Sequence, residues 1–230
     1  MIQINLICRV IVLCLGVAAD AQAMQFELRT IPESSPVRAE LVMSGRVEGN
    51  ELGHLKDWVG KNPGIDTVIL KNSNGGDAAT GYAVGEYIRE KGLATGVAGH
   101  CLSSCSRMFL GGKRRFFTDE FSPEKTMVGF HGNYRSDGSL NTERLHYLKQ
   151  WVMKYMDWDD ARKSKYQGLV EQWVNTPNHH GFMYFFNEEK FKTTDGASVI
   201  YCNGSEPRQQ RLELCEHKLD VNSRGVGVTR

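Results

Sequence analysis

Short apolar runs alternate with amphipathic segments through the first half of the chain. Residues 39–47 alternate apolar and polar side chains as a strand does, whereas residues 51–59 repeat apolar side chains at helical spacing. The apolar run at 67–70 is typical of a strand that is buried on both faces of a sheet. The same patterns predict a helix over 78–90 and a strand over 94–98.

The next elements continue this order. A short helix is predicted over 103–110, and strands are predicted over 114–117 and 127–130. Residues 141–174 carry apolar side chains at helical spacing and predict one long or two shorter amphipathic helices. Strand–helix–strand repeats force parallel pairing, with helices that cover the sheet. The predicted fold class is therefore α/β, with a mainly parallel sheet and flanking helices.

The first 23 residues have the layout of a cleavable signal peptide. Arg9 precedes the apolar run 10–19, and Ala21-Gln22-Ala23 supplies the small residues that a signal peptidase accepts. The alternative is an uncleaved membrane anchor, but the run is about half of the ~20 apolar residues that a spanning helix needs. The prediction is an exported protein, secreted or periplasmic, cleaved near Ala23.

Composition and charge exclude some partners and bound the domain count. The chain has 28 Lys and Arg against 27 Asp and Glu, a formal charge of +1, which gives no electrostatic reason to expect nucleic acid or an anionic membrane surface. The mature length suits one well-buried core. We expect one domain over 24–200, with a helical segment at 140–192, and a polar tail over 201–230.

The cysteines predict disulfide bonds, one of them in the tail. Two of the six cysteines leave with the signal peptide, and an even count in an oxidising compartment favours disulfides over metal thiolates among Cys101, Cys105, Cys202 and Cys215. Cys202 and Cys215 are expected to pair and to staple the tail. Cys101 and Cys105 lie one helical turn apart, which is awkward for a bridge within a regular helix. Either they are bridged and the first residues are not helical, or they are two free buried thiols.

Three stretches carry the parts of a serine hydrolase. Serine is a poor nucleophile, so it needs a base and paired backbone N–H donors for the oxyanion. Ser103 lies where a strand meets a helix, whose first N–H groups are free. Gly75-Gly76 follows a strand and lets a backbone N–H approach a substrate closely. His131 follows an apolar strand, so its imidazole is expected at a strand end.

The segments KNSNGGD, GHCLSSCSRMFLGGKRR and MVGFHG, in this order, resemble the Clp protease proteolytic subunit and its superfamily, whose fold of repeated β-β-α units is shared with crotonases. The resemblance covers residues 42–131 and is greatest to the exported, cysteine-containing branch. It implies that Ser103 is the nucleophile and His131 the general base. It further implies that the backbone N–H groups of Gly76 and Ser104 hold the oxyanion. A helix cap is the alternative role for either serine.

The third member of the triad departs from the family pattern. The family has an Asp after the helix that follows the base, and the corresponding residues here, 176–183, contain no carboxylate. Asn178 is the candidate, since an Asn can accept the Nδ1–H of an imidazole but cannot stabilise its positive charge. A Ser–His dyad and Asp195 are the alternatives. The adjacent His179 and His180 lack the spacing of a metal site.

The sequence thus predicts an exported Clp-like serine hydrolase, a peptidase acting on peptide or protein, with no cofactor, metal or nucleic acid. Subunits of this family form rings, so the resemblance allows a homo-oligomer, but the sequence leaves the oligomeric state open. One alternative is a catalytically inactive binding or assembly module, since function resides in sites and not in folds. Another is a crotonase-like acyl-thioester enzyme, for which Asp77 is the one acidic residue beside the glycines.

Overall fold

The structure of the chain is a computed structural model that describes residues 23–31, 38–187, 199–205 and 215–218. Apart from Ala23, the predicted signal peptide lies outside the described residues. Among the described residues, no helix is both long and apolar enough to cross a membrane.

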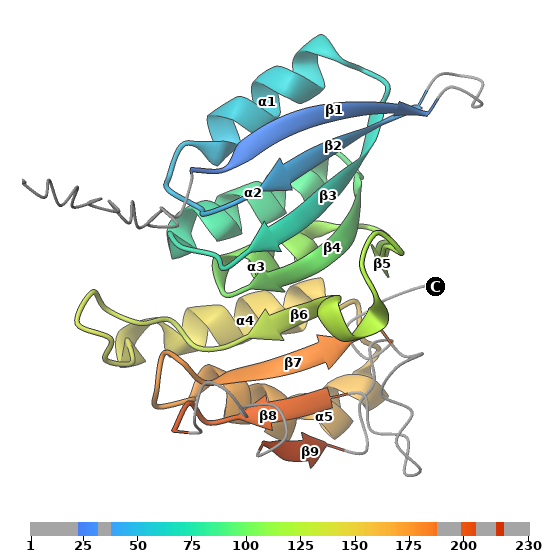
Figure 1. Cartoon of the computed structure of the whole chain (residues 1–230). Coiled ribbons are helices and arrows are strands. Elements are labelled where there is room, and N and C mark those ends of the chain that lie inside the picture. The colour runs from blue at the N-terminus through green and yellow to red at the C-terminus, as the bar shows by residue number, and fades with distance from the viewer. Residues whose placement is uncertain (1–22, 32–37, 188–198, 206–214, 219–230) are drawn as a thin grey trace, which may run out of the picture.

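One sheet of nine strands organises the chain (Figure 1). Its strands are β1 (Gln25–Ile31), β2 (Arg38–Ser44), β3 (Ile65–Ser73), β4 (Ala94–Leu102), β5 (Arg115–Phe117), β6 (Met127–Phe130), β7 (Phe182–Phe186), β8 (Val199–Cys202) and β9 (Glu216–Lys218). Their order is β1-β2-β3-β4-β6-β7-β8-β9, and β5 pairs with β4. The centre, β2 to β6, is parallel, whereas β1 and β7 to β9 pair antiparallel at the two sides.

Helices connect the parallel strands β2 to β3, β3 to β4 and β4 to β5, as their parallel pairing requires. The helices are α1 (Glu51–Lys61), α2 (Ala78–Glu90), α3 (Ser104–Gly111), α4 (Leu145–Tyr155) and α5 (Asp160–Val174), with the 3₁₀ turns η1 (Pro123–Lys125) and η2 (Thr142–Arg144). Alternate strand residues such as Val68 and Leu70 share the main core with α2 to α5, whereas Ile69 belongs to a separate cluster. Because strand side chains alternate between faces, these helices cover one face of the sheet.

An ionic network of Arg89, Arg115 and the exposed Asp157 fixes the junction between α4 and α5. Arg115 is 2% exposed, and it donates to the carboxylate of Asp157 at 3.0 Å and to four backbone carbonyls. Arg89 donates to the same carboxylate at 2.8 Å. Asp157 has a φ of 58°, so the helical segment breaks there into two helices.

The predicted fold class is confirmed: a mixed α/β fold with a parallel centre and flanking helices. The predicted spans 78–90 and 127–130 match α2 and β6 to the residue. The expected pairing of Cys202 with Cys215 is confirmed, and this disulfide links the end of β8 to the residue before β9. Both strands join the sheet, so this segment extends it.

Candidate active site

Ser103 occupies a strained turn between a strand and a helix. It follows Leu102, the last residue of β4, and precedes α3, with φ 56° and ψ −125°. Such a conformation costs a non-glycine residue about 1–3 kcal/mol and persists only where the surroundings impose it. Here the N–H of Ser103 donates to the carbonyl of Gly129 at 3.0 Å, and its carbonyl accepts from Ser106. Both backbone groups of Ser103 are thus hydrogen-bonded, and Ser103 lines the two clefts described below.

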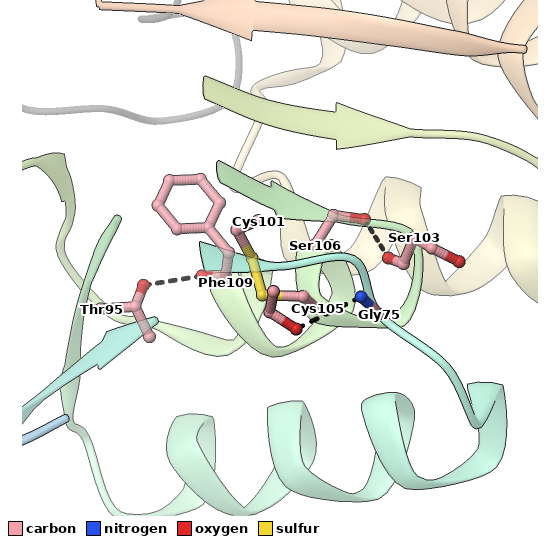
Figure 2. The surroundings of a disulfide bond; sticks show 8 residues. Gly75, Thr95, Cys101, Ser103, Cys105, Ser106 and Phe109 are labelled. Atoms are coloured by element: carbon pink, nitrogen blue, oxygen red, sulfur yellow. Dashed lines mark hydrogen bonds between the residues drawn. A yellow bond between two sulfur atoms is a disulfide. The ribbon is translucent and has the colours of Figure 1, made fainter. Parts of the chain in front are cut away.

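A disulfide brackets this turn (Figure 2). Cys101 is in β4 and Cys105 is the second residue of α3, with Cα atoms 5.2 Å apart and both residues fully buried. The bridge thus crosses the junction of strand and helix, which removes the difficulty of joining two cysteines within one regular helix. Of the two possibilities left open by the sequence, the structure has the bridge.

The imidazole of His131 meets the Ser103 hydroxyl. Nε2 of His131 lies 2.7 Å from Oγ of Ser103, within hydrogen-bond distance. The parallel pairing of β4 with β6, which sets Leu102 opposite Gly129, brings the ends of these strands together. His131 is 7% exposed, and its ring stacks on that of Phe182, with centroids 4.1 Å apart.

Burial sets the protonation state of His131. Desolvation holds the pKa of His131 well below its usual range, and the positive charge of Arg107 acts in the same direction. The backbone carbonyls of His179 and Gly181 oppose this fall without reversing it. A neutral imidazole has a free lone pair, so His131 can accept a proton from Ser103.

Asn178 does not take the place of the third triad member. Its Nδ2 donates to the carbonyl of Gly204 at 3.1 Å, and its Oδ1 accepts from the N–H of His180 at 3.0 Å. Both ends of the carboxamide thus hold a local turn, and Nδ1 of His131 has no hydrogen-bond partner in the described part of the chain. The proposed contact between Asn178 and His131 is therefore corrected. Asp195 lies outside the described residues.

The glycine turn that carries one of the two predicted N–H donors lies against the turn of Ser103. A Cβ atom on Gly75 would lie 2.7 Å from Cβ of Ser103 and 2.8 Å from the backbone nitrogen of Ser104, so the glycine turn touches the serine turn. Gly75 and Gly76 have φ values of 82° and 148°. The carbonyl of Gly75 accepts from the N–H of Val47, and the N–H of Asp77 donates to the carbonyl of Val47. Within the described residues, the N–H groups of Gly76 and Ser104 have no acceptor.

Two clefts meet at the Ser103–His131 pair. Their volumes are about 920 Å³ and 500 Å³. Both are lined by Arg46, Gly76, Ser103, His131 and His179. An extended molecule that crosses from one cleft to the other would pass the serine hydroxyl.

Arg107 and Phe182 belong to this site, although the sequence reading singled out neither. Arg107 is 3% exposed, and its Nη2 donates to the carbonyls of His131 at 3.2 Å and Gly132 at 3.3 Å and to Oδ1 of Asn133 at 3.1 Å. A charged residue within the apolar and small residues of α3 was the available signal for Arg107. The sequence offered no such signal for Phe182, because Phe182 is one of several aromatic residues in β7.

The remaining candidate groups have structural roles or no cluster around them. His179 and His180 have ring centroids 3.8 Å apart, but the described residues contain no group of three or more His, Cys, Asp or Glu that could hold a metal. Asp77 caps α2, since its carboxylate accepts from the N–H of Thr80 at 2.7 Å.

Comparisons with known proteins add solved structures that are similar in part. The chain is similar to two mutants of the 1510-N membrane-bound stomatin-specific protease, the second in complex with a substrate peptide, at 11% identity and TM-scores of 0.41 and 0.43. These matches cover 58% of this chain and 67% and 63% of those chains. A ClpP1 mutant from Listeria monocytogenes matches at 12% identity and a TM-score of 0.45, over 64% of this chain and 81% of that one. No family model and no curated protein matches.

Proposed function

We propose that this protein is a serine hydrolase that cleaves peptide bonds. Ser103 attacks the substrate carbonyl while His131 takes the proton from its hydroxyl, and His131 then returns this proton to the leaving amine. The N–H groups of Gly76 and Ser104 stabilise the oxyanion of the tetrahedral intermediate. Water attacks the acyl-enzyme in the second half of the reaction, with His131 again as the base, and regenerates Ser103.

The contact between Ser103 and His131 carries the proposal. Their 2.7 Å separation joins a serine held at positive φ to a buried histidine whose low pKa keeps it neutral. A helix cap requires neither the strained backbone nor a base at its hydroxyl, so this pairing favours nucleophile over cap.

The catalytic pair acts as a dyad in this proposal. A triad carboxylate orients the imidazole and stabilises its charged form. Here Phe182 and the backbone around His179 and Gly181 hold the ring, and none of them supplies a negative charge. We therefore expect slower turnover than that of a serine peptidase with an Asp.

Peptide is the proposed substrate because the two clefts extend to either side of the serine, and because of the Clp-like motifs. The proposed place of action is outside the cytoplasm. Its support is the signal-like segment 1–23 and the disulfides Cys101–Cys105 and Cys202–Cys215, since disulfides persist in oxidising compartments.

The test is covalent labelling of the oxidised protein with a fluorophosphonate, followed by peptide mapping of the adduct. We expect one adduct on Ser103, its loss in Ser103→Ala, and a fall in rate of at least about a hundredfold in His131→Gln. Ser104→Ala is the matched control. Its side chain is fully buried and Oγ has no partner among the described residues, while the Ser104 N–H survives the change. Labelling of Ser104 in place of Ser103 would contradict the assignment.

A binding or assembly module remains the second candidate. The observation that favours it is the absence of a carboxylate partner for His131 in the part of the chain that the structure describes. A folded sample that forms no adduct at any serine, and that cleaves no peptide in a mixed library, would establish this role instead.

A further inference from the structure

Arg107 is a buried cation without an anionic partner. It forms no ion pair in the described part of the chain, and its Nη2 meets only neutral acceptors. Its Nε is buried and has no hydrogen-bond partner there. Arg115 is buried to a similar degree, and it pairs with Asp157 at 3.0 Å. An unpaired buried charge is costly. Arg115 has an anionic partner, whereas Arg107 has none in the described part of the chain.

Arg107 lines the larger of the two clefts, as the proposed nucleophile does. Arg107 follows Ser103 by four residues, one turn of α3, and both residues line this cleft together with Gly76 and His131. A substrate group in the cleft would therefore be close to both the serine hydroxyl and the arginine.

The other charges of the cleft leave Arg107 unneutralised. Asp77 and Glu48 also line the cleft, but neither comes within ion-pair distance of Arg107, and Asp77 is engaged as the cap of α2. Arg46 lines the cleft as an exposed residue and forms no ion pair among the described residues. Arg135 is also there, and it is paired with Glu143 at 3.2 Å. The cleft thus holds two cations, Arg46 and Arg107, with which no carboxylate of the described chain forms an ion pair.

A neutral contact on one face of Arg107 does not replace an anion. Its guanidinium lies 5.5 Å from the centre of the Tyr82 ring, a cation–π contact. This contact covers one face of the planar group, whereas the hydrogen-bond donors point outward from its edge. A carboxylate fits such an edge because guanidinium and carboxylate form paired, charge-assisted hydrogen bonds.

We propose that the larger cleft is a subsite for a substrate carboxylate, and that Arg107 is its main ligand, with Arg46 at the rim. This inference rests on the proposed function, and it assigns the substrates as peptides with an acidic group next to the bond that is cleaved. The carboxylate is that of a Glu or Asp side chain, or that of a peptide C-terminus.

The test compares matched fluorogenic peptides that differ in one charge. One pair carries Glu or Gln on the N-terminal side of the cleaved bond, and a second pair ends in a free carboxylate or an amide one residue after that bond. We expect the wild-type protein to cleave the acidic member of one pair with at least about tenfold higher kcat/KM, because charge-assisted hydrogen bonds are stronger than those between neutral groups. The pair that shows the preference identifies the source of the carboxylate.

Variants separate charge recognition from folding. Arg107→Gln should abolish the preference, Arg107→Lys should keep part of it, and Arg46→Gln should reduce it by a few fold. Arg135→Gln is the matched control at the same cleft and should keep the preference. Arg107 holds the segment from His131 to Asn133 by its hydrogen bonds. The rate of fluorophosphonate labelling at Ser103 reports whether this segment is intact in each variant.

The outcomes distinguish this inference from the proposed function. Equal cleavage of both members in both pairs, by protein that labels at Ser103, would overturn the subsite and leave the hydrolase standing. If no labelling occurs, the proposed hydrolase function is rejected. Fluorescence anisotropy of the same peptides with the wild-type protein then tests whether the cleft binds a carboxylate. Tighter binding of an acidic peptide that is lost in Arg107→Gln would support it, and equal binding of both members would refute it.

Discussion

The ring of Phe182 lies parallel to the imidazole of His131, with centroids 4.1 Å apart and an interplanar angle of 14°. The antiparallel pairing of β6 with β7, in which Phe130 faces Met183, brings the two rings together. The stack faces an imidazole whose Nδ1 has no hydrogen-bond partner among the described residues. We therefore expect Phe182 to be a positioning residue, which fixes the plane of the His131 ring that a carboxylate would otherwise hold by its edge.

We predict that Phe182→Leu slows the labelling of Ser103 by about two- to tenfold. Aromatic pairs contribute about 0.5–1.5 kcal/mol beyond their burial, which converts to this range if the stack orients the base. The measurement is the second-order rate constant of fluorophosphonate labelling, with the folded fraction determined in parallel.

Phe186→Leu is the matched control for Phe182. Phe186 points to the same face of β7 and belongs to the same aromatic cluster, but its contact is with Tyr184 and not with His131. It should lose stability comparable to that of Phe182→Leu and label at the wild-type rate. Equal rates in both variants would show that the stack does not position the base.

The low pKa of His131 predicts a pH dependence of stability. Burial, aided by Arg107, favours the neutral imidazole in the folded state, so the unfolded chain binds more protons below the usual histidine pKa of about 6.5. The contribution of neutral His131 to the free energy of unfolding is complete above pH ~6.5, and it is lost as the pH falls toward the depressed pKa of the folded state. Between pH 7.5 and 5.5 the wild-type protein should lose about 1 kcal/mol that His131→Gln does not lose.

The same shift predicts that activity survives mild acid. Since His131 stays neutral below pH 6.5, the midpoint of the labelling rate should lie below the usual histidine value. His100→Gln is the control, because burial also lowers the pKa of His100, which has no contact with Ser103. A midpoint at or above pH 6.5 would contradict a buried, neutral base.

The sequence predicted the parallel half of the fold and singled out the two residues of the proposed catalytic pair, which the structure places within hydrogen-bond distance. Glycine-rich turns after apolar strands fixed the order of β3, α2, β4 and α3, and parallel pairing then brings Ser103 near His131. These contacts follow from local patterns, since each turn is set by residues within a few positions of the strand that it ends.

The antiparallel side could not be predicted in the same way. The span Phe182–Phe186 is a run of aromatic residues and Met without polar alternation, so its pattern does not tell a buried strand from other apolar segments. The role of Asn178 was predicted from its place in the chain, yet its carboxamide bonds to Gly204, which a strand pairing brings near. Arg107 was overlooked because burial of a charge depends on the tertiary contacts of its whole side chain.

The disulfide Cys101–Cys105 should support reactivity more than the disulfide Cys202–Cys215. The first bridge closes the turn that holds Ser103 at positive φ, and a relaxed turn would regain about 1–3 kcal/mol of backbone strain. We expect Cys101→Ala combined with Cys105→Ala to lower the labelling rate by roughly ten- to a hundredfold, by the conversion of 1.4 kcal/mol to tenfold.

The second disulfide provides the control for the first. Its cysteines are 13 residues apart and lie in the part of the sheet formed by β8 and β9. Replacing both with Ala should cost about 3 kcal/mol of stability through the larger loop, while folded protein labels at the wild-type rate. A labelling rate that falls with the second pair and not with the first would reverse the assigned roles.

Gly75→Ala tests whether the glycine turn must touch the serine turn. A Cβ there would lie 2.5 Å from the carbonyl oxygen of Leu102 and 2.7 Å from Cβ of Ser103, and the φ of 82° disfavours any side chain. The substitution should move the Gly76 N–H away from the oxyanion and lower the labelling rate by about a hundredfold, the effect of losing one such donor.

Gly53→Ala is the corresponding control. A Cβ there has no neighbour within 4 Å, and the residue lies in α1, so the change should add roughly 0.5–1 kcal/mol of stability and leave labelling unchanged. If folded Gly75→Ala protein labels as fast as Gly53→Ala protein, the oxyanion is not held by the Gly76 N–H. The donors would then have to come from the start of α3, because among the described residues the Ser104 N–H is the other one that touches this turn and has no acceptor.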